Sequence, residues 1–472
     1  MLIEEARDYV VEKLPYALNP KSIAVVGSSR LDGKVGYKVI EGLEKWGYDG
    51  KIYPVNPRAK EVQGLKAYPT VKDIPDEVDL AFVAVPAHVV KSVLEDCVAK
   101  GVKIAVISTS AFKEIGREEL QNELTQYCRD NELPLIGPNL VGMGSPYFHF
   151  NCGFIPYLPV PGPVAMISQS GANLLAALGT SQEDHLGMSF FVGLGNKADV
   201  DFAEFIEYAD KDPNTGSIAV YIEGLDSPEA FVKAAQKSTK PIVVIKVGGS
   251  KIGHKAAFAH TASENPESDE YYQSVFDRAG VIRATTWQEF LDDALALGLM
   301  PPLLGDNIVM ITNGGGSGLL SCDHFERRGL PLKELKEISP LLFGKIRNYM
   351  PMFGSPLNPV DISGTATPIQ YRGAVSQALR DPNVDCVYVS ICPTAVTDVN
   401  EVADQVIEVW NQNKSANKPV VMECQGGKEC HDIILKLRDA GIPAYPTAEQ
   451  AVNAIVALRE YGKILDEKEK AE

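Results

Sequence analysis

The chain has few cysteines, and their spacing does not suggest a disulfide framework or a metal site. The 472 residues include eight cysteines, with no Cys-x-x-Cys pair and no histidine at zinc-ligand spacing. Scattered cysteines of this kind are typical of free thiols in a reducing compartment. We therefore expect a cytoplasmic protein without disulfides, and no metal ligands in this chain.

Long apolar runs and excess basic charge are also absent. No apolar run reaches the ~18–20 residues needed to cross a bilayer, and the first residues are charged, unlike a secretory signal. The net charge of −17 would repel nucleic acids and anionic membranes. We expect neither as a partner. With 45% hydrophobic and 23% charged residues, the chain can form about three globular domains.

No P-loop motif occurs, and the first glycine-rich loop departs from the dinucleotide pattern Gly-x-Gly-x-x-Gly. This loop, Gly27–Gly36, nevertheless lies between a predicted strand and a predicted helix, where parallel α/β folds bind phosphate. The second strand is followed by Asn56 and Arg58 rather than by the acid that binds an NAD ribose. These residues suit a phosphorylated ribose, which favours coenzyme A or an NADP-like ligand. Glycines needed only for tight packing are the alternative.

Short β-branched runs alternate with helical stretches throughout the first part of the chain. This alternation predicts a parallel sheet with both faces covered. The expected strands of the first domain are 22–26, 51–55, 80–85, 103–108 and 135–136.

The remainder of the chain contains an internal duplication. Pro163–Gly171 resembles Asn307–Gly316, and similar pairs of landmarks follow in the same order in both halves. We therefore expect two sister domains of the doubly wound α/β class. The predicted division is a Rossmann-like domain at 1–150, sister domains at 151–300 and 301–462, and a frayed tail at 463–472.

Three turns of small residues follow predicted strands, and the carboxyl ends of parallel strands share one crevice. The first turn precedes a helix, whose free N–H groups and dipole favour an anion. Its Ser-Gln-Ser-Gly sequence differs from the hydrolase motif Gly-x-Ser-x-Gly, so Ser170 is not expected to be a nucleophile. The predicted phosphate-binding residues are Ser168, Gln169, Ser170, Gly171, Gly195, Asn196 and Lys197. The remaining turn contains Asn139.

Glu223 directly follows the predicted strand 217–222. An acid at the carboxyl end of a strand faces the crevice, where it could bind one nitrogen of an imidazole and leave the other free. A helix-capping role is the alternative.

One sister domain contains an insertion that the other lacks. The interval from Gly248 to Gly280 is about twice that from Gly426 to Gly441, and the extra residues include His254 and His260. A segment added to one of two sister domains is a place where function tends to lie. Either histidine could accept a phosphoryl group.

At these motifs the chain resembles the α subunit of the NDP-forming acyl-CoA synthetases, ADP-forming acetyl-CoA synthetase in particular, in the succinyl-CoA synthetase superfamily. The shared motifs are Ser168-Gln-Ser-Gly, Gly195-Asn-Lys-Ala-Asp, Tyr221-Ile-Glu-Gly, His260-Thr and Thr312-Asn-Gly-Gly-Gly. The resemblance covers nearly the whole chain. It implies a CoA-binding domain followed by two flavodoxin-like domains.

The family's phosphorylated histidine stands in Ala-Ala-x-Ser-His-Thr-Gly, which corresponds to Ala256–Ala262. Alanine replaces both the flanking serine and the glycine here. His254, in Gly-His, resembles a motif of succinyl-CoA synthetase, and we favour His260 over it. The resemblance implies that CoA binds at Gly27, Ser28, Ser29, Arg30, Lys34, Gly36, Asn56, Arg58, Val85, Pro86 and Asn139.

The resemblance implies the reaction of acyl-CoA, phosphate and ADP to carboxylic acid, CoA and ATP, through acyl phosphate and a phosphohistidine. Glu223 would orient His260. No ATP-grasp part occurs in these residues, so Mg²⁺ and ADP or ATP would bind to a β partner, in an α2β2 assembly. A non-catalytic CoA-sensing or scaffold subunit and a succinyl-CoA synthetase-like ligase are the alternatives. A Rossmann oxidoreductase is disfavoured because the acid that binds NAD is missing.

Overall fold

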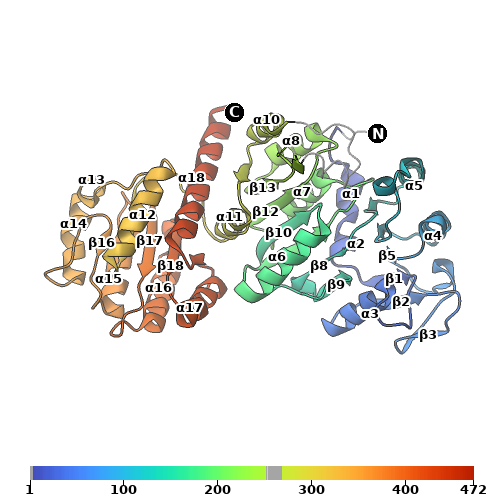
Figure 1. Cartoon of the computed structure of the whole chain (residues 1–472), viewed down its shortest axis with the longest axis horizontal. Coiled ribbons are helices and arrows are strands. Elements are labelled where there is room, and N and C mark those ends of the chain that lie inside the picture. The colour runs from blue at the N-terminus through green and yellow to red at the C-terminus, as the bar shows by residue number, and fades with distance from the viewer. Residues whose placement is uncertain (1–3, 251, 254–267, 472) are drawn as a thin grey trace. The chain divides into compact units, whose positions relative to one another are not determined.

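The computed structural model describes residues 4–250, 252–253 and 268–471. The chain divides into two compact units, Met1–Arg283 and Ala284–Glu472 (Figure 1). Each unit is an α/β structure built on parallel strands. In the part of the chain that the structure describes, no helix has the length and apolar character to cross a membrane.

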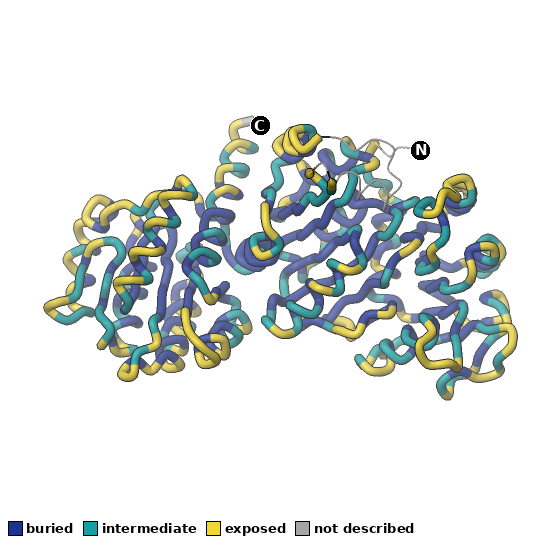
Figure 2. Tube along the Cα trace, viewed as in Figure 1, coloured by how far each residue is buried: buried dark blue, intermediate teal, exposed yellow. Residues whose placement is uncertain are grey.

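The first sheet has five parallel strands in the order β2-β1-β5-β6-β7. Alternate residues of β1 enter two different cores: Ile23 and Val25 pack with helix α3, whereas Ala24 and Val26 pack with α4 and α5. Both faces of the sheet are therefore covered, and its central strands β1, β5 and β6 are buried (Figure 2). The five predicted strands are present, two of them shorter than expected. The bounds are β1 Ser22–Val26, β2 Lys51–Val55, β5 Leu80–Val83, β6 Ile104–Ile107 and β7 Leu135–Ile136, with α1 Asp8–Lys13, α2 Pro15–Leu18, α3 Val35–Lys45, α4 Ala87–Lys100, α5 Glu118–Asp130, η1 Val71–Asp73, η2 Lys113–Ile115 and the small hairpin β3 Glu61–Val62 and β4 Leu65–Lys66.

The second sheet has seven strands in the order β14-β13-β12-β10-β11-β8-β9. Strands β8 and β9 form an antiparallel hairpin on β11. This hairpin begins at Gly142, so the boundary predicted at residue 150 falls inside the second sheet. The bounds are β8 Gly142–Ser145, β9 Phe150–Gly153, β10 Pro161–Ser168, β11 Met188–Gly193, β12 Ser217–Ile222, β13 Ile242–Lys246 and β14 Ile282–Ala284, with η3 Pro146–Phe148, α6 Gly171–Asp184, α7 Phe202–Lys211, α8 Pro228–Lys237 and α10 Asp269–Ala279.

The third sheet repeats the parallel part of the second. Its order is β16-β15-β17-β18-β19, which corresponds strand for strand to β11-β10-β12-β13-β14. This correspondence confirms the duplication and the doubly wound α/β class. The bounds are β15 Ile308–Thr312, β16 Val360–Asp361, β17 Cys386–Ile391, β18 Val420–Cys424 and β19 Ala444–Tyr445, with α11 Trp287–Leu299, α12 Gly315–Arg327, α13 Leu335–Ile338, α14 Pro340–Ile346, α15 Pro368–Arg380, α16 Val399–Asn413, α17 Lys428–Asp439, α18 Ala448–Ala471, η4 Arg347–Tyr349 and η5 Lys414–Ala416.

Two helices do not follow the domain bounds predicted from the sequence. Helix α11, expected at the end of the second domain, lies in the second compact unit. There Asp292 of α11 accepts hydrogen bonds from Tyr445 and Gln450, at 2.8 and 2.9 Å. Helix α18 continues to Ala471, through residues predicted to be frayed. The reason is composition, because the Lys, Glu and Ala residues of this tail favour helix.

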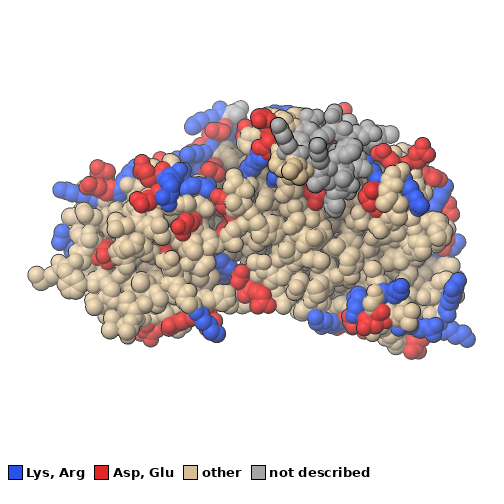
Figure 3. All heavy atoms as spheres, in the orientation of Figure 1, with Lys and Arg blue, Asp and Glu red and all other residues tan. Residues whose placement is uncertain are grey.

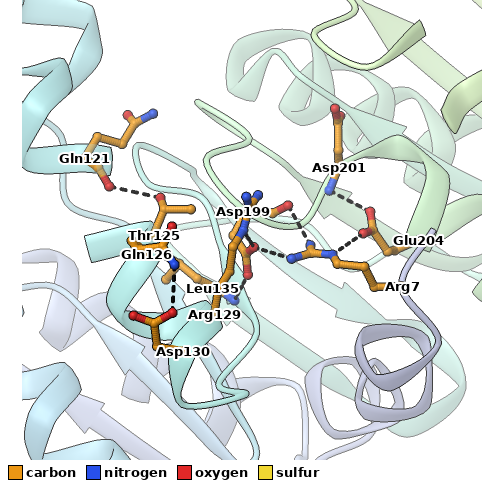
Figure 4. Close-up of polar contacts among 10 residues, drawn as sticks. All are labelled: Arg7, Gln121, Thr125, Gln126, Arg129, Asp130, Leu135, Asp199, Asp201 and Glu204. Carbon is orange, nitrogen blue, oxygen red and sulfur yellow. Dashed lines mark hydrogen bonds and ion pairs between the residues drawn. The ribbon is translucent and has the colours of Figure 1, made fainter. Parts of the chain in front are cut away.

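A buried polar network joins the first and second sheets (Figure 4). The carboxylate of Asp199, fully buried, accepts hydrogen bonds from Arg7 at 2.5 Å, from Arg129 at 2.8 Å and from the backbone N–H of Leu135 at 3.1 Å. Arg7 also donates to Glu204 of α7 at 2.9 Å. The chain segment before α1, helix α5 and strand β7 are thereby tied to the segment between β11 and α7.

We expect Asp199→Ala to lower the free energy of unfolding of this unit by about 3 kcal/mol or more, because it removes one member of a buried ion pair and leaves its partners unsatisfied. Urea unfolding monitored by hydrogen exchange in peptides of the first two sheets measures the change. Asp130→Ala is the matched control, because Asp130 is exposed and bonded to Gln126 alone among the contacts in Figure 4. An equal effect of the two substitutions would contradict the role of the network.

Candidate active site

A cavity of about 180 Å³ lies in the first compact unit, where strands of the first and second sheets end. Polar side chains and glycines form nearly all of its lining. The lining residues are Lys113, Asn139, Val141, Gln169, Gly171, Gly195, Asn196, Glu223, Gly224 and Asp226. Six of the residues predicted from the sequence therefore meet in one cavity: Asn139, Gln169, Gly171, Gly195, Asn196 and Glu223.

The amino end of helix α6 forms one wall of the cavity. Ser170 is the N-cap, and its Oγ accepts a hydrogen bond from the backbone N–H of Asn173 at 3.4 Å. The first turn of a helix leaves N–H groups that can bind an anion. Gly171 is required here, because a Cβ at this position would lie 2.5 Å from Cγ1 of Val141. Ser168 and Ser170 are buried and do not line the cavity, and Ser168 donates to the carbonyl of Ser170 at 2.8 Å.

Gln169 and Glu223 form a second wall. The Oε1 of Gln169 accepts hydrogen bonds from the backbone N–H groups of Glu223 and Gly224, at 2.9 and 3.0 Å. The backbone N–H of Gln169 in turn donates to the carbonyl of Tyr221 at 3.1 Å. These bonds hold the turn after β12 beside the end of β10, so the Glu223 carboxyl group is placed at the cavity by a rigid backbone.

The turn after β11 closes the cavity toward the first sheet. Gly195 has φ of +58°, and a Cβ there would lie 2.2 Å from the carbonyl oxygen of Pro138, so only glycine fits. Asn196 donates from Nδ2 to Glu114 at 2.7 Å and to Gln121 at 3.0 Å. Burial raises the pKa of Glu114, but the hydrogen bonds from Asn196 and the backbone outweigh burial and lower it. Glu114 is therefore ionised and anchors the turn.

Lys197 lies beneath the cavity and does not line it. Its side chain is fully buried, with the ammonium 2.5 Å from Asp226 and 3.5 Å from Asp201. Burial alone would lower the pKa of Lys197, but the two carboxylates raise it above its usual value. The side chain stays charged, and its ammonium group pairs with two carboxylates of the protein rather than facing the cavity.

Among the described residues, Lys113 is the cation that lines the cavity, and it is not one of the residues predicted from the sequence. It belongs to η2, which follows β6, and Glu118 lies 3.7 Å from its ammonium group. The signal was available, because Lys113 follows a predicted strand of the first domain. Val141 and Asp226 were missed as well. In Figure 3 acidic and basic side chains lie together near the edges of the face seen, and most of that face is uncharged.

The residues predicted to bind CoA gather at the carboxyl ends of β1, β2 and β5. Gly27 has φ of +90°, and a Cβ on Gly36 would lie 2.2 Å from its carbonyl oxygen, so α3 starts directly against the loop. Asn56 donates to the carbonyl of Ser28 at 2.7 Å. The other residues of this set are exposed or half-buried: Ser29, Arg30, Lys34, Arg58, Val85 and Pro86. Pro86 is also the N-cap of α4.

His254 and His260 lie outside the described residues. The strand before the insertion ends at Lys246, whose register partner Ile222 precedes Glu223. Burial lowers the pKa of Lys246 to about 8, with Asp269 acting in the opposite direction. Its ammonium lies 4.2 Å from the centre of the Tyr272 ring.

Family models match three segments of the chain. A CoA binding domain matches residues 21–145, a succinyl-CoA ligase like flavodoxin domain matches 161–297, and a Ligase-CoA domain matches 308–463. The alpha subunit of acetate–CoA ligase [ADP-forming] I from Pyrococcus furiosus is 42% identical over 454 residues, which cover 94% of this chain and 97% of the relative. The chain belongs to the alpha subunits of the ADP-forming acetate–CoA ligases. The resemblance and the enzyme class predicted from the sequence are confirmed.

Two other members of the family are informative, one because it is longer than this chain and one because its structure has been solved. The acetate–CoA ligase [ADP-forming] of Methanocaldococcus jannaschii is 38% identical over 96% of this chain, but the match spans 64% of the relative. The dinucleotide forming acetyl-coenzyme A synthetase 1 of Ca. Korarchaeum cryptofilum, solved with phosphate and ADP, has a TM-score of 0.90 at 38% identity, covering 97% of this chain and 98% of that one.

The lowered pKa of Lys246 predicts a pH-dependent stability. Above pH 8 the folded chain loses this proton, whereas the unfolded chain keeps it up to about pH 10.4. The unfolded state then binds more protons, so wild type should gain stability relative to Lys246→Met as the pH rises through this window. Urea unfolding at several pH values measures the difference.

Lys72→Met serves as the control for Lys246→Met. A hydrogen bond to Asp96 raises the pKa of Lys72, so its contribution should be lost with rising pH rather than gained. The same slope for both variants would show that Lys246 does not cause the effect.

Proposed function

We propose that this chain is the α subunit of an ADP-forming acyl-CoA synthetase. It converts acyl-CoA, phosphate and ADP to carboxylic acid, CoA and ATP through acyl phosphate and a phosphohistidine. The observation that carries the proposal is the single cavity shared by the amino end of α6, the Gly195–Asn196 turn, Glu223 and Lys113. These groups supply donors for an anion and a carboxylate for an imidazole.

The first step joins phosphate to the acyl group. A phosphate oxygen attacks the thioester carbonyl, the carbon–sulfur bond breaks, and the CoA thiolate leaves and takes up a proton. The N–H groups at the start of α6 and the ammonium of Lys113 stabilise phosphate and the charge that develops on the carbonyl oxygen. CoA reaches the cavity from the first domain, where the loop from Gly27 holds its phosphates, and Asn139 bridges that domain to the cavity.

The second step moves the phosphoryl group to the protein. An imidazole nitrogen of His260 attacks phosphorus, the bond from phosphorus to the carboxyl oxygen breaks, and the carboxylate leaves. Glu223 accepts a hydrogen bond from the other imidazole nitrogen, which selects the tautomer and stabilises the charged phosphohistidine. The backbone N–H of Glu223 donates to Gln169, which fixes the turn that carries this carboxylate.

The third step needs a partner. We assign the binding of Mg²⁺ and of ADP or ATP to an ATP-grasp β subunit, in an α2β2 assembly. The lengths of the relatives support this: alpha subunits match this chain over nearly their full length, whereas relatives without a subunit name are longer. All eight cysteines are free, which suits the cytoplasm.

Reconstitution tests the function and the partner together. The chain with an ATP-grasp β subunit should release CoA from acetyl-CoA over many turnovers, with formation of ATP, only when both phosphate and ADP are present; a thiol reagent follows the CoA. The chain alone should form no ATP. ADP-dependent turnover by the isolated chain would rule out the partner's role. CoA binding without turnover in any combination would favour a CoA-sensing subunit instead.

The phosphorylated residue is tested by labelling. With acetyl-CoA, Mg²⁺ and radioactive phosphate, the chain should acquire an acid-labile, base-stable phosphoryl group, because phosphohistidine has that chemistry. His260→Ala should reduce labelling to background, while His254→Ala, a matched substitution in the same segment, should retain it. Labelling that survives in His260→Ala and disappears in His254→Ala would move the assignment to His254.

A further inference from the structure

Val141 differs in kind from the rest of the cavity lining. Among the described residues that line the cavity, it has the one side chain without a polar atom. A carboxylic acid presents two kinds of surface, a charged carboxyl group and an apolar chain. The polar lining suits the phosphate and the carboxyl group, so the apolar chain has Val141 as its natural contact.

The position of Val141 is rigid. The residue lies directly before β8, and its carbonyl accepts a hydrogen bond from the backbone N–H of Phe154 at 3.1 Å. The preceding carbonyl, that of Leu140, accepts from the hydroxyl of Ser108 at 3.0 Å. The backbone at Val141 is therefore held from both the first sheet and the β8–β9 hairpin, so it cannot shift at low cost to admit a larger group.

The Val141 methyl groups lie beside the amino end of α6, as their distances from two glycine positions show. Cγ1 would lie 2.5 Å from a Cβ on Gly171, the first residue of α6. Cγ2 would lie 3.4 Å from a Cβ on Gly193, the last residue of β11. A branched side chain thus fills the space between the phosphate-binding end of the helix and the next strand. An acyl phosphate held at α6 would project its acyl group toward it.

We propose that Val141 sets the upper size of the acyl group that the cavity accepts. This specificity role rests on the function proposed above. A branched or aromatic acyl group would meet the Val141 methyl groups, and the rigid backbone would not yield. Removing these methyl groups should open space next to the reacting carbonyl carbon without touching the groups that bind phosphate.

The test uses the full chain and the reverse of the first step. The CoA sulfur attacks the carbonyl carbon of an acyl phosphate, the bond from that carbon to the phosphate oxygen breaks, and phosphate leaves. Thioester absorbance follows the product. Acetyl, propionyl, isobutyryl and benzoyl phosphate provide a size series, and kcat/KM is compared as the ratio of each to acetyl phosphate.

Val141→Ala should raise the ratio for isobutyryl phosphate about tenfold or more, since one or two methyl groups in a pocket have effects of that order. Val141→Ile should lower the ratio for propionyl phosphate, which gives a second variant should the first fail to fold. Val98→Ala is the matched control, a partly buried valine of α4 outside the cavity, and it should leave all ratios unchanged.

The outcomes separate this inference from the function on which it rests. Turnover of acetyl phosphate by Val141→Ala with wild-type ratios would overturn the size limit alone. A wild-type chain that prefers benzoyl phosphate would overturn it as well. Failure of wild type with every acyl phosphate, while CoA still binds, would overturn the proposed function and this inference together.

Discussion

The cavity depends on a carboxylate buried between two sheets. Asp199 accepts hydrogen bonds from Arg7 and Arg129, and it follows Asn196 by three positions in the chain. The segment after β11 is thereby held against the first sheet. A buried carboxylate is stable only when its partners are correctly placed, so the network admits one arrangement of this segment. The contacts of Asn196 with Glu114 and Gln121, and so the closure of the cavity, depend on that arrangement.

Charge within the site is divided between binding and structure. Lys197 looks from its sequence like an anion ligand, yet two carboxylates neutralise it beneath the cavity. The chain carries a net charge of −17, so free phosphate has no general attraction to its surface. In the proposed function, oriented N–H groups at α6 and the ammonium of Lys113 therefore bind the phosphate. Both act over short distances in a partly buried setting, where the effective dielectric constant is lower than in water.

The two sister domains show how function was added to one copy of a fold. Strand β12 is followed by Glu223, whereas its counterpart β17 is followed by Cys392. Strand β13 is followed by Gly248 and Gly249 and then the histidine insertion. After β18 the corresponding glycines lead directly into α17, which begins at Lys428. The parallel strands are shared between the copies, and the chemistry differs only in the segments after the strands.

Periodicity and local motifs were sufficient for the strands, the duplication and the family. The alternation of apolar strands and helices depends on neighbouring residues, and so do the turn at Ser168–Gly171 and the Rossmann-like loop. These features are local, and the sequence determined them by itself. The choice of Gln169, Asn196 and Glu223 as crevice residues also followed from their places after strands, since parallel strands end at one edge.

Long-range packing decided the rest. Nothing near Val141 in the sequence marks it as a cavity residue. Lys113 follows a predicted strand, but both residues reach the cavity only when the first sheet and the β8–β9 hairpin are in place. The burial of Lys197 needs Asp226, 29 residues away, and the continuation of the second sheet into β8 and β9 needs pairing with β11. Such contacts join residues distant in the chain, so only the tertiary structure could determine which groups face the ligand and which face one another.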